Sequence, residues 1–105
     1  MRHYALAALL LVLSLSATAA NVAVVTIENY GFHPQELTIA AGTTVRWVNR
    51  EKRQYHSVWF KEQGEPEPDY FFPGEHYERT FETPGTYPYR CGPHPEMTGT
   101  LHVVE

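Results

Sequence analysis

The stretch 86–104, TYPYRCGPHPEMTGTLHVV, combines two strand-like segments with a loop of unusual composition. Segments 86–91 and 98–104 are short and rich in β-branched and aromatic residues, which is typical of β-strands. In the second segment Leu101 and Val103 fall on one face of the expected strand, so both are candidates for the core. The stretch therefore predicts two strands joined by a short loop.

Further segments upstream have the same strand-like composition, and Gly or Pro residues separate them. Val45 and Trp47 share a face of one such segment. His56, Val58 and Phe60 share a face of another. Together with the first two, these segments predict a single all-β domain, a sandwich with one core. The upstream segments are Val22–Glu28, Leu37–Ile39, Thr43–Asn49, His56–Phe60 and His76–Phe81.

Residues 1–20, MRHYALAALLLVLSLSATAA, have the features of a signal peptide. Arg2 precedes an apolar run, and small residues follow the run where a signal peptidase would cut. A membrane anchor would need a span of about 20 apolar residues, and this run is shorter. We therefore expect an exported, soluble mature chain of one domain, residues 21–105, with cleavage before Asn21 or before Ala20.

The charge of the mature chain limits its partners. Without Arg2, seven of the eight Lys and Arg residues remain against twelve Asp and Glu, which gives a net charge of −5. This balance argues against nucleic acid or an anionic membrane as a partner. Several acidic residues lie in the polar segment 61–69, which we expect to be a surface loop, either simply solvated or a docking patch for a cationic partner. They are Glu62, Glu65, Glu67 and Asp69.

Cys91 is the chain's one cysteine, so it cannot form a disulfide within the chain. An inert buried thiol or an intermolecular disulfide would account for it, but His94 and Met97 follow at steps of three. A thiolate, an imidazole and a thioether together favour copper over magnesium, calcium or manganese. Electron-transfer copper sites combine one thiolate, two imidazoles and a weak thioether. The second imidazole must come from elsewhere, and His56, at the start of an expected strand, is the best candidate.

Proline residues flank the one histidine of segment 91–97. Pro93 and Pro95 restrict the backbone on both sides of His94, which predicts a stiff loop that resists rearrangement. Ligands at steps of three along such a loop can converge on one point. The remaining histidines of the mature chain are expected on the surface: His33, His76 and His102.

The chain resembles the cupredoxins, small blue-copper proteins of the plastocyanin and amicyanin type. The resemblance rests on segments 32–49, 55–58 and 72–104, and the Cys-x-x-His-x-x-Met spacing is similar to the short loop of amicyanin-like members. It implies a Greek-key β-sandwich with one copper ion near one end, cycling between Cu(I) and Cu(II). The residues that the resemblance implies as ligands are His56, Cys91, His94 and Met97.

One residue departs from the family pattern. In most of these families an asparagine follows the first histidine ligand and ties the two ligand loops together, whereas this chain has Ser57. A hydroxyl reaches less far than an amide, so we expect the contacts around the ligands, and with them the redox potential, to differ.

Two functions are compatible with these residues. The first is a monomeric one-electron carrier in the periplasm that docks transiently with a protein donor and a protein acceptor. In this function His94 would pass the electron at an uncharged surface formed by Gly92, Pro93 and Pro95. The alternative is a periplasmic copper-binding protein for copper resistance or delivery. An enzyme such as a copper oxidase is not expected, because the chain is short and lacks further histidines for a catalytic centre.

The leader sequence makes a testable prediction. Mass measurement of the secreted protein should give Asn21, or failing that Ala20, as its first residue, because the small residues end there. Recovery of the intact chain from the membrane fraction would contradict the prediction of a soluble exported protein.

Overall fold

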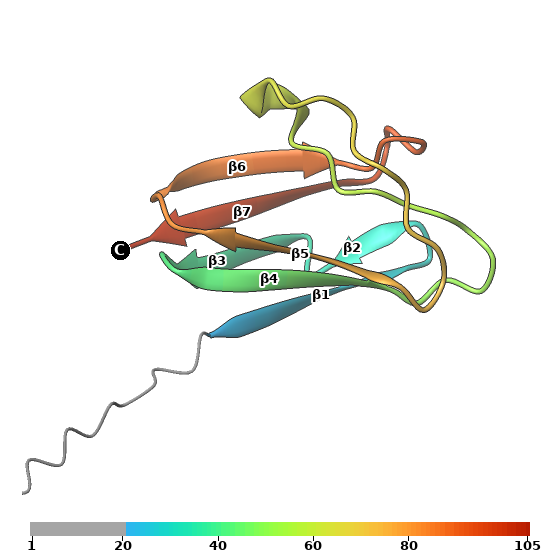
Figure 1. The fold of residues 1–105 in the computed structure, drawn as a ribbon, viewed down its shortest axis with the longest axis horizontal. Coiled ribbons are helices and arrows are strands. Elements are labelled where there is room, and N and C mark those ends of the chain that lie inside the picture. Colours follow the sequence, from blue (N-terminus) through green and yellow to red (C-terminus); the bar gives the residue numbers. More distant parts are fainter. Residues whose placement is uncertain (1–20) are drawn as a thin grey trace, which may run out of the picture.

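The computed structural model describes residues 21–105, so the expected signal peptide, residues 1–20, lies outside the described residues. The described part consists of β-strands and one turn of 3-10 helix (Figure 1). The strands are β1 (Val22–Glu28), β2 (Gly31–His33), β3 (Glu36–Ala40), β4 (Thr43–Asn49), β5 (His76–Phe81), β6 (Gly85–Arg90) and β7 (Thr98–Val104), and the helical turn is η1 (Lys61–Gln63).

The strands form two mixed sheets that face each other (Figure 1). One sheet has the order β2-β1-β4-β5 and the other the order β3-β7-β6. The β1/β4 and β3/β7 pairs are parallel, and the remaining pairs are antiparallel. The chain crosses between the sheets after β2, after β3 and after β5, so strands distant in sequence become neighbours. This arrangement confirms the expected all-β sandwich. Within residues 21–105, no helix has the length and apolar character needed to cross a bilayer.

Aromatic side chains fill the space between the sheets. Trp47 is fully buried, and its ring packs edge-on against Tyr89, with centroids 5.5 Å apart. The Trp47 indole N–H donates a hydrogen bond to the Tyr89 hydroxyl, 3.2 Å away. Burial raises the pKa of Tyr89 to about 12, against the opposing effect of this bond. A Cβ at Gly99 would lie 2.3 Å from the Tyr89 ring, so glycine is needed for β7 to pass beneath it.

The segment His56–Phe60, which we predicted as a strand, is not one. His56 forms an isolated bridge with Phe71, and Trp59 forms another with Arg90 at the end of β6. The segment therefore passes from one sheet toward the other and cannot pair along its length with either. Burial also departs from alternation, because Ser57 is buried together with His56 and Val58.

Other boundaries differ by less. The predicted segments for β1, β4, β5 and β7 coincide with the observed strands. The short strand β2, which pairs with β1, was not predicted, and β6 both begins and ends one residue before the predicted segment 86–91.

The acidic segment 61–69 is partly bonded to the sandwich. Both carboxylate oxygens of Glu65 accept hydrogen bonds from the guanidinium of Arg79 on β5, at 2.7 and 2.6 Å. These bonds lower the pKa of Glu65, while burial opposes the shift. The Glu65 carbonyl also accepts a bond from the Trp59 indole N–H. Glu65 therefore anchors this segment and is not merely solvated.

This ion pair predicts a pH-dependent contribution to stability. Glu65→Gln should lower the free energy of unfolding of the metal-free protein by about 1 kcal/mol at pH 7, since the pair is about one-third exposed. The folded pKa lies below the unfolded value of about 4.3, so the stabilisation is complete above that value and is lost as the pH falls through the folded pKa. Urea unfolding at a series of pH values checks this. The exposed Glu62→Gln variant is the control, and a difference for Glu65→Gln that stays constant into acid would contradict the prediction.

Candidate metal centre

The predicted ligands come from two segments at one end of the sandwich. His56 lies in the connection between β4 and β5, and Cys91, His94 and Met97 lie in the loop between β6 and β7. Figure 1 shows these two connections at the same end of the molecule. Because both connections lie at this end of the sandwich, the fold brings His56 close to Cys91 and His94, although it lies far from them in the sequence.

The donor atoms of three of these residues are close enough together to share one metal ion. Nδ1 of His56 is 3.5 Å and Nδ1 of His94 is 3.6 Å from Sγ of Cys91. All three donor atoms lie within 4.8 Å of one another. Metal bonds of about 2.3 Å to sulfur and about 2.0 Å to nitrogen, at a roughly tetrahedral angle, place sulfur and nitrogen about 3.5 Å apart. The spacing therefore fits a metal held by one sulfur and two imidazole nitrogens.

Met97 is buried next to this cluster and closes the loop. Its N–H donates to the carbonyl of His94, and its carbonyl accepts from the N–H of Cys91, both at 2.9 Å. Only 2% of the Met97 residue is exposed, so its thioether lies inside the protein. The loop from Cys91 to Met97 is thus tied at both ends by its own backbone.

Burial sets the protonation of the donors. Burial raises the pKa of the Cys91 thiol, and the N–H groups of Ser57 and His94 oppose that shift. Burial lowers the pKa of His56, with the Glu51 hydrogen bond opposing and the neighbouring His94 adding to the shift. His56 is therefore neutral near pH 7, as a metal ligand must be, and a metal must displace the proton of the thiol.

Glu51 fixes the ring of His56. Its Oε1 lies 3.1 Å from Nε2 of His56, on the side of the ring away from Cys91. A carboxylate can only accept here, so Nε2 carries the proton and Nδ1 presents its lone pair to the cluster. The side chain of Glu51 is 11% exposed, so this bond is shielded from water. The sequence does not mark Glu51 as part of the site, because one acidic residue in the charged run 50–53 gives no local signal.

Asn49, also missed, shapes the segment that leads to His56. Its amide nitrogen donates to the carbonyls of Gln54 and Phe71, at 2.9 and 3.1 Å, and its Oδ1 accepts from the N–H of Glu51 at 2.9 Å. Asn49 is 1% exposed, and its bond to the Phe71 carbonyl is buried, whereas those to Gln54 and Glu51 are partly buried. A signal was present in the sequence, since Asn49 falls on the same face of β4 as Trp47.

Ser57 links the two segments that carry the donors. Its hydroxyl accepts a hydrogen bond from the N–H of Gly92 at 2.8 Å, and its own N–H donates to Sγ of Cys91 at 3.3 Å. A Cβ at Gly92 would lie 2.7 Å from the Ser57 hydroxyl and 2.4 Å from a carboxylate oxygen of Glu67. The short serine side chain therefore does connect the loops, because glycine at position 92 lets the backbone approach closely.

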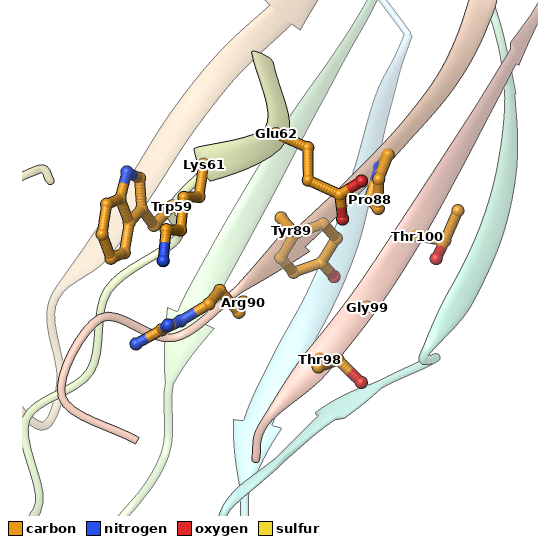
Figure 2. Close-up of a pocket in the computed structure, with 9 residues that line it drawn as sticks. All are labelled: Trp59, Lys61, Glu62, Pro88, Tyr89, Arg90, Thr98, Gly99 and Thr100. Carbon is orange, nitrogen blue, oxygen red and sulfur yellow. The ribbon is translucent and has the colours of Figure 1, made fainter. Parts of the chain in front are cut away.

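Arg90 supports the same loop from the other side. Its guanidinium donates to the carbonyls of Cys91 and Gly92, at 3.1 and 2.8 Å, and lies over the Trp59 ring at 4.9 Å from the centroid. A groove of about 280 Å³ lies beside Arg90. Figure 2 shows Trp59 and Lys61 on one side of this groove and Thr98, Gly99 and Thr100 of β7 on the other. The groove is lined by none of the four predicted ligands, so it is separate from the candidate metal centre.

Exposed aromatic side chains surround His94. The ring of Tyr30 lies edge-on to His94 with centroids 5.1 Å apart, and Tyr55 lies 6.2 Å from His94. Tyr55 also stacks on Tyr70 at 5.0 Å and contacts Phe72 at 5.9 Å. We call Tyr30, Tyr55, Tyr70 and Phe72 the aromatic patch; each is 39% exposed or more. The sequence predicts an uncharged surface at His94 from Gly92, Pro93 and Pro95, whereas these four aromatic residues come from other segments and were not predicted.

The remaining histidines lie apart from the cluster. Within the described residues 21–105, His56, Cys91 and His94 are the one group of His, Cys, Asp or Glu side chains arranged to hold a metal. His33 and His76 are exposed, and His102 bonds to Glu36 on the neighbouring strand at 2.9 Å. Their expected surface positions agree with the structure.

A β-sandwich with a thiolate and two imidazoles at one end defines a class of soft-metal proteins, and comparison with known proteins identifies the family. Residues 19–104 match the copper binding proteins, plastocyanin/azurin family. A plastocyanin from Scenedesmus fuscus is 40% identical over 84 residues, which cover 69% of this chain and 85% of that protein. Amicyanin-alpha from Methylorubrum extorquens is 40% identical over 85 residues, which cover 77% of this chain and 70% of that protein.

A solved structure agrees with these relatives. The crystal structure of amicyanin from Paracoccus versutus superposes with a TM-score of 0.70 and 35% identity, covering 83% of this chain and 85% of that chain. The chain belongs to the plastocyanin/azurin family of copper-binding proteins. This confirms the resemblance, the cupredoxin sandwich and copper as the metal.

The link made by Ser57 leads to a prediction. Ser57→Ala should lower the free energy of unfolding of the metal-free protein by about 1–2 kcal/mol, because the Gly92 N–H loses its acceptor. The Gly92 amide should also exchange its hydrogen faster. Urea unfolding and NMR-detected exchange measure the two effects. Thr38→Ala, which removes an exposed hydroxyl, is the control, and equal losses in the two variants would contradict the proposed role of the link.

Proposed function

We propose that this protein is an exported, monomeric carrier of single electrons, in which one copper ion per chain is held by His56, Cys91, His94 and Met97. The observation that carries the proposal is the unequal exposure of the two imidazoles. His56 is fully buried, whereas His94 is half-buried and sits within the aromatic patch. One face of the centre is thus closed by protein, and the other reaches the surface through a single side chain.

Copper bound there supplies a centre that cycles between Cu(I) and Cu(II). The chain's own residues keep water away and restrict movement of the donors. The Cys91 sulfur accepts the Ser57 N–H, and the His56 ring is held by Glu51. Pro93 and Pro95 limit the backbone on both sides of His94. Donors held in this way change position little when the charge at the centre changes, which favours rapid electron exchange.

The aromatic patch is the surface proposed for exchange with partners. Its four side chains are uncharged, with the Glu67 carboxylate bonded to the Tyr70 hydroxyl beside them, and small surfaces of this kind suit the weak encounters that electron-transfer partners make. The donor and acceptor are proteins that dock there transiently. The net charge of −5 for residues 21–105 disfavours nucleic acid as a partner.

The proposed location is the periplasm, which rests on the leader-like residues 1–20. The competing function is copper resistance or delivery, in which the metal must leave the protein. A catalytic role is not proposed, because the other histidines of residues 21–105 lie outside the cluster and no second metal group accompanies it in that part of the chain.

Copper loading and electrochemistry test the proposal. The mature protein with Cu(II) should show an intense visible band from the thiolate, which Cys91→Ser abolishes while the β-fold persists. Voltammetry should give a reversible one-electron wave with the metal retained. Release of Cu(I) to a chelator on each reduction, without a reversible wave, would favour copper handling instead.

The orientation of the centre is tested in the same experiment by a matched pair of variants. In His94→Gly, added imidazole should restore the visible band, because the vacated position faces the aromatic patch. In His56→Gly, imidazole should restore it much less, because that ring is 0% exposed. Equal rescue of the two variants would contradict the proposed orientation.

A further inference from the structure

The turn between β1 and β2 has an unusual backbone. Asn29 and Tyr30 both have positive φ angles, 52° and 55°, and Glu28 pairs with Gly31 across the turn. Two-residue hairpin turns of this kind favour glycine or asparagine at both positions. Asparagine tolerates the left-handed conformation, but a bulky tyrosine does so at an energetic penalty. Tyr30 must therefore be held in place by other contacts.

Burial of the ring does not account for this conformation. Tyr30 is 47% exposed, so a large part of its surface gains nothing from the core. Its backbone N–H donates to Oε1 of Glu51 at 2.7 Å. The same oxygen accepts the Nε2–H of His56. One shielded carboxylate oxygen thus holds both the strained turn and a proposed copper ligand.

The ring of Tyr30 meets both imidazoles. It lies edge-on to His56, with centroids 5.8 Å apart and planes at 85°, and edge-on to His94, at 5.1 Å and 89°. The two imidazoles lie 4.9 Å apart. Within residues 21–105, Tyr30 is the one aromatic side chain outside the cluster with contacts to both rings; Tyr55 contacts His94 alone.

We propose that Tyr30 is a positioning residue of the copper centre, a strained clasp whose ring restrains the rotation of both His56 and His94. The inference rests on the proposed function, because it assigns Tyr30 to those two ligands. Glu51 holds the backbone of the turn, the turn directs the ring over the imidazoles, and the ring restricts their alternative orientations. Strained backbone conformations are retained mainly at functional sites, so the strained conformation of Tyr30 supports a role in the copper centre rather than in folding alone.

Three variants separate positioning from structural support. Tyr30→Gly removes the ring and also relieves the backbone, so the melting temperature of the metal-free protein should stay within about 3 °C of the native value. The copper self-exchange rate should nevertheless fall about tenfold, as expected when a group that orients a ligand is removed. Tyr30→Phe keeps the ring and should exchange within about twofold of the native rate. Val24→Ala, which shortens an exposed side chain on β1 outside the aromatic patch, is the control for the rate.

A readout without copper keeps this test independent of the proposed function. In NMR relaxation of the metal-free protein, Tyr30→Gly should increase the ring mobility of both His56 and His94, whereas Tyr55→Ala should increase that of His94 alone. If native protein gives no reversible wave, the carrier function fails while these mobilities still test the clasp. Unchanged histidine ring mobility in Tyr30→Gly, or a rate and a melting temperature that fall together in Tyr30→Gly and Tyr30→Phe alike, would overturn the proposal.

Discussion

The structure of the metal centre depends on one close contact, the hydrogen bond from the Gly92 N–H to the Ser57 hydroxyl. It joins the connection between β4 and β5 to the loop between β6 and β7, which carry the donors from opposite sheets. A second hydrogen bond, from the Ser57 N–H to the sulfur of Cys91, also joins these two segments. Because both bonds are local to the donors, a small shift between the sheets does not separate His56 from the thiolate. Glycine at position 92 is the condition for this contact, since any Cβ would collide with the serine hydroxyl and with Glu67.

Packing inside the sandwich prepares this contact. Trp47 and Tyr89 come from different sheets, and their rings and hydrogen bond hold β4 against β6. Tyr89 lies two residues before Cys91, and Asn49 lies two residues after Trp47 on the same buried face of β4. The core therefore sets the position of both strand ends from which the donor segments start. Asn49, the last residue of β4, then fixes the path of the following connection, because its side chain bonds three backbone groups of that connection.

Sequence patterns were sufficient for the parts of the fold that local chemistry determines. Alternation identified β1, β4, β5 and β7 with their observed bounds, and the soft ligand set in 91–97 indicated copper. Alternation was wrong for 56–60, because that segment crosses between the sheets, and His56, Ser57 and Val58 are buried in succession. Strand β2 is only three residues long, too short for a periodic signal. The roles of Glu51 and Tyr30 could not be predicted, because the Glu51 carboxylate meets His56 through an irregular segment without periodic signal, and it meets the Tyr30 backbone across 21 residues of sequence.

The two imidazoles of the centre have different surroundings, and this difference gives the site its direction. His56 is closed in by the core and by a shielded carboxylate, so its ring nitrogen on the far side from the thiol is already bonded within the protein. His94 lacks such a partner among the hydrogen bonds of the described residues and meets instead the edges and faces of exposed rings. An electron leaving through His56 would have to cross the core, whereas one leaving through His94 reaches the surface within a single side chain. The rings of Tyr30 and Tyr55 next to His94 are uncharged, whereas the exposed carboxylate of Glu67 accepts a hydrogen bond from the Tyr70 hydroxyl at 3.0 Å. A partner docking at the aromatic patch, as proposed, would therefore meet uncharged rings at His94 and one carboxylate beside Tyr70, whose desolvation opposes close approach there.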